Sequence, residues 1–239
     1  MTGYTASPRT LNSQLLWRCR KNDKDILFRQ VSDVWCPPAT LATLGRLNRE
    51  NEPILYASAH ESLAALEVHP QPGDLLTIIE LRRKPDTSKP VVMELGVAEK
   101  NAKFNVGPRI ELFTETVRGQ ELLASGESIA KQRDIRSFLA EEFTRPVAKG
   151  NEHLFKISAA IAEIFLTGDA CDGVLYPACA GNPAEYVGGQ NVGLKPDRAN
   201  SFFEVSDCKV VRASTVNGKL QFNTIQASRQ IESSGRINW

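Results

Sequence analysis

The chain has 239 residues and a mass of 26.4 kDa, and its 29 Lys and Arg residues nearly balance its 28 Asp and Glu residues, giving a formal net charge of +1. Proteins that bind nucleic acid by general attraction to phosphate are normally basic, so the charge argues against that class. The composition, 41% hydrophobic and 24% charged, is that of an ordinary globular protein and not of a collagen, a disulfide scaffold or a disordered chain. A chain of this length buries about 70% of its unfolded surface, enough for one sizeable core.

Cysteine usage and hydropathy bear on the compartment. The five cysteines form an odd set at irregular spacings with no Cys-x-x-Cys pair, which favours reduced thiols. The apolar run from Leu15 to Trp17 is too short for a signal peptide. No stretch approaches the roughly 20 apolar residues that a membrane helix needs. We therefore expect a cytoplasmic protein without a membrane partner; export by a signal-independent machine would leave no trace in the sequence.

The first half of the chain predicts short strands around one helix. Residues 1–25 are expected to form an N-terminal helical extension. The helix from His60 to Val68 has apolar residues at helical spacing, with Ser58 as N-cap and Glu61 completing a capping box. The predicted strands of this half are Ile26–Val31, Ile54–Ala57, Asp74–Arg82 and Pro90–Leu95.

The second half predicts two longer helices and a closing hairpin. The helices span Ser128–Phe143 and Leu154–Leu166, and a buried strand follows at Gly173–Pro177. After a Gly-rich loop from Gly181 to Gly189, the Asn217-Gly218 pair has the signature of a β-hairpin turn.

The order of these elements fits one α+β domain with mixed strands and flanking helices, because strands and helices do not alternate strictly. We expect this domain to span residues 26–226, with helical insertions between residues 101 and 150. Residues 227–239 are expected to form a polar, loosely held tail.

Three stretches place polar or ionisable residues at the ends of predicted buried strands, where side chains converge on a cleft. The first is Phe28-Arg29. The second is Gly45-Arg46-Leu47-Asn48 followed by Leu55-Tyr56, with Glu67 on the next helix. The third runs from Asp172 to Ala178 and is followed by Asn191.

In this order, the stretches resemble the RES-domain family, named for its Arg, Glu and Ser. The matching pattern is an apolar-Arg pair, Gly-Arg-x-Asn, Leu-Tyr on a strand, a Glu about eleven residues after the Tyr, and a distant Asp-Gly-x-x-Tyr-Pro followed by an Asn. The resemblance covers residues 26–205, and the conjunction of five spaced pieces is far more specific than any one of them.

The resemblance implies a fold like that of the ADP-ribosyltransferase toxins and an activity on NAD as substrate, with no metal or other cofactor. Family members cleave the nicotinamide–ribose bond and pass the ADP-ribose to phosphate, water or a protein. Many are toxins that deplete NAD and are held by an antitoxin or immunity protein with a helix-turn-helix domain. The implied catalytic residue is Glu67, and the implied NAD-binding residues are Arg29, Arg46, Asn48, Tyr56, Ala178 and Asn191.

The residue types suit this chemistry. Breaking an N-glycosidic bond develops positive charge on the ribose, which a fixed carboxylate stabilises, so Glu67 is the candidate. Arg29 and Arg46 offer the fork-shaped donors that a pyrophosphate needs, with Asn48 as a lesser donor. Tyr56 is a candidate to stack on the nicotinamide ring.

Each of these residues also has an ordinary structural interpretation. Glu67 fits a solvated helix face, Arg29 an ion pair at a strand edge, and Tyr56 a core tyrosine. Arg46 and Asn48 could simply organise their loop. The three histidines, His60, His69 and His153, are too scattered for a metal site or a triad and fit surface or capping roles.

The chain departs from the family where Ala178 stands in place of the serine after Tyr-Pro. Three interpretations follow. In the first, the missing hydroxyl weakens NAD binding or turnover. In the second, the Ala178 backbone or a shifted Cys179 takes over the role of the serine; for Cys179 this needs a bulge or a loop, because neighbouring strand residues face opposite ways. In the third, the alanine was introduced to silence a toxic enzyme.

Two other functions compete with an NAD phosphorylase or glycohydrolase. Loss of the serine fits a catalytically weakened binding module that recognises a protein partner. The same fold would also suit an ADP-ribosyltransferase that modifies a protein side chain.

Overall fold

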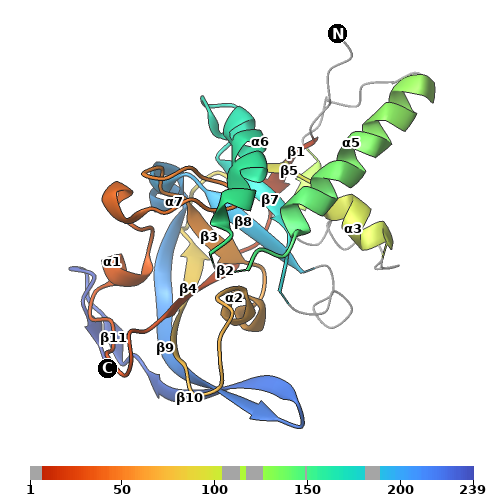
Figure 1. Cartoon of the computed structure of the whole chain (residues 1–239). Helices are drawn as coiled ribbons and strands as arrows, with labels where there is room; N and C mark the ends of the chain where they lie inside the picture. Colours follow the sequence, from red (N-terminus) through yellow and green to blue (C-terminus); the bar gives the residue numbers. More distant parts are fainter. Residues whose placement is uncertain (1–6, 104–113, 117–125, 149, 181–188) are drawn as a thin grey trace.

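The computed structural model describes residues 7–103, 114–116, 126–148, 150–180 and 189–239. The strands are β1 (Ser7–Leu11), β2 (Leu15–Lys21), β3 (Leu55–Ser58), β4 (Leu75–Arg83), β5 (Val91–Glu94), β6 (Thr114–Thr116), β7 (Gly173–Pro177), β8 (Gln190–Leu194), β9 (Phe203–Val216), β10 (Lys219–Ala227), β11 (Gln230–Ile231) and β12 (Ile237–Asn238). The helices are α1 (Val31–Val34), α2 (Glu61–Glu67), α3 (Val97–Lys103), α5 (Gly126–Thr144), α6 (Lys156–Leu166) and α7 (Pro196–Phe202), with the 3-10 turns η1 (Ala39–Leu41) and η2 (Glu152–Phe155). The α+β class predicted from the sequence is confirmed (Figure 1).

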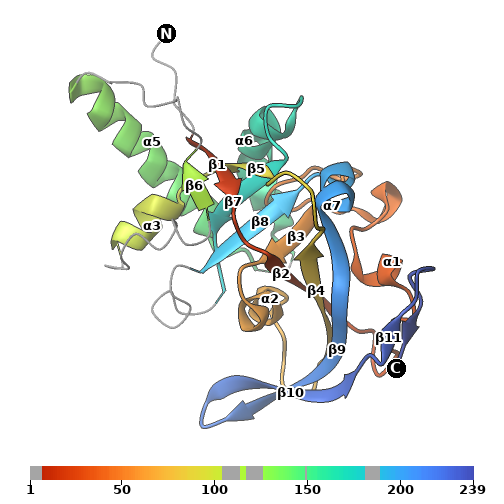
Figure 2. The same cartoon turned by 180° about the vertical axis from the view of Figure 1, so that it is seen from behind.

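Ten of the strands form one sheet in the order β10-β9-β4-β2-β3-β8-β7-β5-β1-β6. Neighbours are antiparallel except β5 and β7, which run parallel. Every residue of β7 and β8 is buried, including the polar Gln190 and Asn191 at the start of β8. Figures 1 and 2 show the β9–β10 hairpin projecting from one end of the molecule and helix α5 from the other.

The helices cover different parts of this sheet. Helix α2 packs against β2, β3 and β4, and its Ala64 and Ala65 bury against Leu76 and Ile78 of β4. Helices α5 and α6 pack against β7 and bury a second cluster. That cluster includes Leu139, Phe143, Ala162, Val174 and Tyr176. A cavity lined by residues of both packing regions lies between them.

Most of the predicted elements are confirmed within a few residues. The strands expected at residues 54–57, 74–82, 90–95 and 173–177 correspond to β3, β4, β5 and β7, and the helices expected at 60–68, 128–143 and 154–166 correspond to α2, α5 and η2 with α6. The Asn217-Gly218 turn joins β9 to β10, and both residues have positive φ, as a type I′ hairpin requires.

The N-terminal expectations are wrong. Residues 7–11 and 15–21 are strands β1 and β2, not a helical extension, and β2 lies inside the sheet between β4 and β3. Its partner β4 lies more than fifty residues further along the chain, so a non-local ladder overrides the local pattern. The strand expected at residues 26–31 is irregular, with an isolated bridge at Gln30 before helix α1 begins at Val31.

The C-terminal tail is folded back onto the domain, against expectation. Strands β11 and β12 pair with each other, and Ile237 is only 3% exposed. The Trp239 Nε1–H donates to the Phe28 carbonyl at 2.8 Å. An apolar residue and an aromatic anchor therefore hold a segment that is otherwise polar.

Smaller expectations also change. His60 rather than Ser58 occupies the N-cap position of α2, and no side chain caps the helix. The Gly-rich loop at 181–188 and parts of the expected insertion (104–113, 117–125 and 149) lie outside the described residues. Within the described ranges, none of the helices combines the length and the apolar character needed to traverse a bilayer.

We expect Gly173→Ala to lower the free energy of unfolding by about 1–3 kcal/mol, because overpacking a core forces the backbone to shift. A Cβ at Gly173 would lie 2.2 Å from the Gly193 carbonyl oxygen of the neighbouring strand. Urea denaturation measures the change. Thr215→Ala, at an exposed position of β9, is the control and should change stability by less than about 0.5 kcal/mol. Equal stability of Gly173→Ala and wild type would contradict the packing described here.

Candidate functional site

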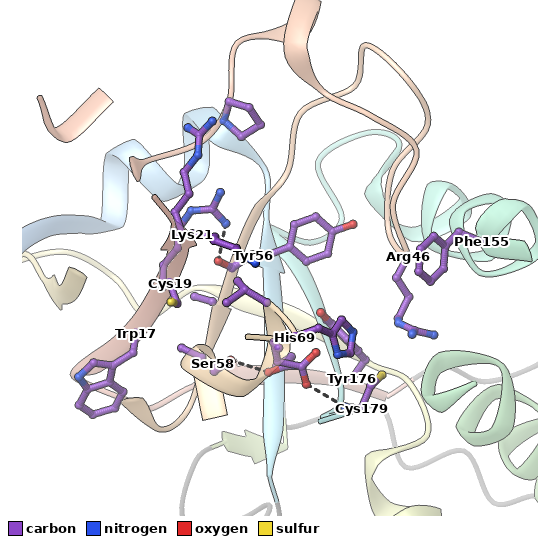
Figure 3. Close-up of a pocket in the computed structure, with 18 residues that line it drawn as sticks. Trp17, Cys19, Lys21, Arg46, Tyr56, Ser58, His69, Phe155, Tyr176 and Cys179 are labelled. Atoms are coloured by element: carbon purple, nitrogen blue, oxygen red, sulfur yellow. Dashed lines mark hydrogen bonds between the residues drawn. The ribbon is translucent and has the colours of Figure 1, made fainter. Parts of the chain in front are cut away.

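The sheet opens between β2 and β3. Strand β2 pairs with β4 over seven residues but with β3 through one residue pair, Trp17 with Ser58. A cavity of about 510 Å³ lies at this opening, a size typical of small-ligand sites. Figure 3 shows Trp17, Cys19 and Lys21 on one side of it and Arg46 with Phe155 on the other.

Glu67, at the C-terminal end of α2, lines this cavity with a fixed carboxylate. Its Oε1 accepts hydrogen bonds from the backbone N–H groups of Cys179 (2.8 Å) and Ala180 (3.1 Å) and from Asn191 Nδ2 (2.8 Å). Asn191 is itself held, because its Oδ1 accepts a 2.6 Å bond from the buried Ser58 hydroxyl. Among the described residues, all of these bonds fall on Oε1 and none on Oε2.

Arg18 of β2 lines the cavity and was not a candidate from the sequence. Its Nε donates to the Val34 carbonyl at 2.8 Å and its Nη1 to the Tyr56 carbonyl at 2.9 Å, so it bridges β2 and β3 where they separate. Burial, reinforced by the neighbouring Arg20, lowers the pKa of Arg18 from its usual value. A guanidinium has five N–H donors, and the bonds to described residues use two of them.

Arg46 lines the opposite wall. Its Nη1 and Nη2 donate to the carbonyls of Glu142 (3.1 Å) and Arg145 (3.0 Å) at the end of α5. The guanidinium also lies over the Phe155 ring, 5.0 Å from its centroid, a cation–π contact visible in Figure 3. These contacts fix the guanidinium and leave part of its fork available.

Tyr56 lines the cavity with its ring, while its hydroxyl is used in the loop before β3. The hydroxyl donates to Asn48 Oδ1 at 2.7 Å and accepts from the Leu47 N–H at 2.8 Å. Burial raises the pKa of Tyr56, so the hydroxyl stays protonated. A Cβ at Gly45 would lie 2.5 Å from Asn48 Oδ1, which explains the glycine in this motif. Asn48 does not line the cavity and supports Tyr56 instead.

Arg29 does not join the other candidates. Its side chain is exposed and does not line the cavity, and its backbone carbonyl accepts the Ile237 N–H at 2.9 Å. The expected strand around Arg29 is absent, and the arginine that enters the cavity from a strand is Arg18. The sequence signal that could have identified Arg18 is its position directly after the apolar run Leu15–Trp17.

Cys179, not Ala178, faces the cavity. Strand β7 ends at Pro177, so Ala178 and Cys179 both lie in a loop. A loop is the condition expected from the sequence for Cys179 to take the position of the family serine. Ala178 is 6% exposed and donates its N–H to the Gly189 carbonyl at 2.9 Å. The Cys179 thiol donates to the Phe143 carbonyl at 3.1 Å, and burial raises its pKa to about 11. The group at this position is therefore a protonated thiol at neutral pH.

Several further residues line the cavity that sequence reasoning missed: Trp17, Cys19, Arg20, Lys21, His69, Phe155 and Tyr176. His69 follows α2 with a left-handed φ of 47°, an arrangement uncommon for a residue other than glycine. Lys21 is paired with Asp74 at 2.6 Å, and the Arg20 guanidinium lies over the Phe28 ring. The sequence signal that could have identified this part of the site is the clustering of Arg20 and Lys21 with Arg18 on one strand.

The described residues contain no group of three or more His, Cys, Asp or Glu side chains that could hold a metal ion. All five cysteines are free thiols. The fold and site together define an α+β protein with a fixed carboxylate and two anchored arginines around a cavity at a split in its sheet. Comparison of the chain with protein-family models, with curated proteins and with solved structures finds no match.

We expect Cys179 to be alkylated by iodoacetamide at least about tenfold more slowly than a free peptide cysteine near pH 8, because only the thiolate reacts. The raised pKa of about 11 keeps the thiolate population small. Mass spectrometry of the peptide that contains Cys179 gives the rate. In urea the unfolded chain should react at the peptide rate, which is the control. Rapid alkylation of the folded protein would contradict the assignment of a protonated thiol.

Proposed function

We propose that the chain is an NAD-consuming enzyme of the RES type, with an ADP-ribosyltransferase-like fold, that cleaves the bond between nicotinamide and ribose. The observation that supports this most is the Glu67 carboxylate, fixed through one oxygen by three N–H donors in a cavity that also holds two anchored arginines. The family resemblance of the sequence supplies the reaction, and the geometry is compatible with it.

The chemistry needs little from the protein besides charge. When the N-glycosidic bond breaks, its electron pair leaves with nicotinamide, which departs neutral because it is cationic in NAD. Positive charge then develops on the ribose, and an anionic oxygen fixed beside it stabilises the transition state. Glu67 Oε2 is the oxygen proposed for this role, because Oε1 is already used in anchoring the side chain.

The two arginines suit the pyrophosphate. Each guanidinium is held by two backbone carbonyls and retains further N–H donors, and bidentate N–H pairs match phosphate oxygens. Tyr56 and Tyr176 line the same cavity, and Tyr56 is the candidate to stack on the cationic nicotinamide ring.

The acceptor of the ADP-ribose defines the subclass. Water, phosphate and a protein side chain would all attack the same ribose carbon, so nicotinamide release should be assayed with and without inorganic phosphate. Labelled ADP-ribose on a protein would favour a transferase. No release from wild type under any of these conditions would overturn the proposal and favour a binding module.

Glu67→Gln should lower kcat for nicotinamide release by about 100-fold or more with little change in KM, because the carboxylate acts on charge that forms in the transition state. Chromatographic detection of free nicotinamide measures both constants. Glu61→Gln is the matched control: Glu61 lies on the same helix, pairs with Lys209 and does not line the cavity. Equal turnover by Glu67→Gln and wild type would remove Glu67 from the reaction.

Arg18→Lys should raise KM for NAD about tenfold or more, because a lysine keeps the charge but not the planar fork that bridges two carbonyls and retains donors. Arg29→Lys should behave like wild type, since the Arg29 side chain is exposed and outside the cavity. The same nicotinamide assay separates the two. The reverse result, with Arg29→Lys impaired and Arg18→Lys normal, would restore Arg29 as the pyrophosphate ligand.

A further inference from the structure

One peptide group links Glu67 to a lysine outside the cavity. The Ala178 carbonyl accepts a hydrogen bond from Lys100 Nζ, and the Cys179 N–H donates to Glu67 Oε1 at 2.8 Å. This carbonyl and this N–H belong to the same planar amide. The amide therefore lies between a cation at its oxygen and a carboxylate at its nitrogen.

Lys100 is held in place by the start of its helix. The buried Glu94 of β5 accepts the Val97 N–H (2.6 Å) and the Ala98 N–H (3.2 Å), which caps α3. Gly96, with φ of 77°, precedes the helix at a close approach to Ala140 of α5, where a Cβ would lie 2.5 Å from the Ala140 Cα. The helix that carries Lys100 is thus fixed to both β5 and α5.

The surroundings of Lys100 connect it electrostatically to the site. Burial lowers the pKa of Lys100, and the nearby Arg46 acts in the same direction, whereas Cys179 and Glu67 oppose the shift. Lys100 does not line the cavity. Its hydrogen-bonded connection to the site therefore runs through the loop after β7, in addition to its through-space attraction to Glu67.

We propose that Lys100 is a positioning residue, whose cation holds and polarises the Ala178–Cys179 peptide so that the Cys179 N–H anchors Glu67. This inference rests on the proposed NAD-cleaving function for its effect on catalysis. A hydrogen bond to a charged donor at one end of an amide strengthens the bond made at its other end. The consequence is a Glu67 oxygen with less freedom to turn away from the reacting carbon.

The first test is kinetic. Lys100→Met should lower kcat for nicotinamide release about tenfold with KM for NAD within about twofold, because anchoring of the carboxylate matters in the transition state. Lys100→Arg should recover most of the loss. Lys195→Met is the matched control, because Lys195 Nζ also donates to a backbone carbonyl, that of Gly168, and does not line the cavity.

The second test does not depend on activity. In Lys100→Met the Cys179 amide hydrogen should exchange with solvent about tenfold faster than in wild type, measured by NMR, and in Lys195→Met it should not. Should Lys100→Met fail to fold, Lys100→Gln, which also lacks the charge, serves for both measurements.

The outcomes separate the two proposals. Unchanged kcat and unchanged Cys179 exchange in the neutral variant would overturn the role of Lys100 while leaving the NAD reaction intact. Wild type that releases no nicotinamide would overturn the NAD reaction, and the exchange rates would still decide whether Lys100 positions the peptide. A KM increase with normal kcat would also overturn the inference, because it would mean that Lys100 acts on substrate binding.

Discussion

The single residue pair between β2 and β3 is the constraint on which the candidate site depends. Beyond Trp17 and Ser58 the two strands separate, and buried backbone carbonyls at such an opening need donors. Arg18 supplies one to Tyr56 on β3 and another to Val34. The same side chain therefore stabilises the opening and presents a cation to the cavity that the opening creates.

Glu67 joins the two parts of the sheet in a second way. It lies on α2, which packs mainly against β2 and β4, yet its hydrogen bonds to described residues go to the loop after β7 and to β8. The Glu67 carboxylate thus connects the α2 region with the loop after β7 and with β8, and these hydrogen bonds hold it in place without an ion pair among the described residues. Loosening the loop between Pro177 and Ala180 would accordingly alter both the width of the cavity and the direction of the carboxylate.

The sequence predicts strands β3, β4, β5 and β7, helices α2, α5 and α6 and the closing hairpin because their signals are local: apolar runs, helical spacing and an Asn-Gly turn. It also brings Arg46, Tyr56 and Glu67 to one cavity, since their spacing follows a strand and a short helix. It fails at β2, because the strand is stabilised by pairing with β4, far along the chain. As a result, Arg29 is predicted from the sequence as the first arginine of the site, whereas Arg18 of β2 lines the cavity. The placement of Cys179 in a loop likewise depends on where β7 ends, which propensity alone does not fix.

Three charged side chains of the cavity, Arg18, Arg46 and Glu67, are anchored by neutral groups, whereas Lys21 is paired with Asp74. Arg18 and Arg46 are held by backbone carbonyls, and Glu67 by two backbone N–H groups and an amide; within the described part of the chain no ion pair joins them. An ion pair would orient these groups but would also neutralise them, whereas a dipole fixes a charge and leaves it available. The near-zero net charge is thus compatible with a strongly polar site, because a small charged ligand meets the local arrangement of charged groups, among them the guanidinium groups of Arg18 and Arg46 and the Glu67 carboxylate. A ligand with a cationic ring joined to a pyrophosphate would be complementary to this arrangement, which is why we propose NAD as the substrate.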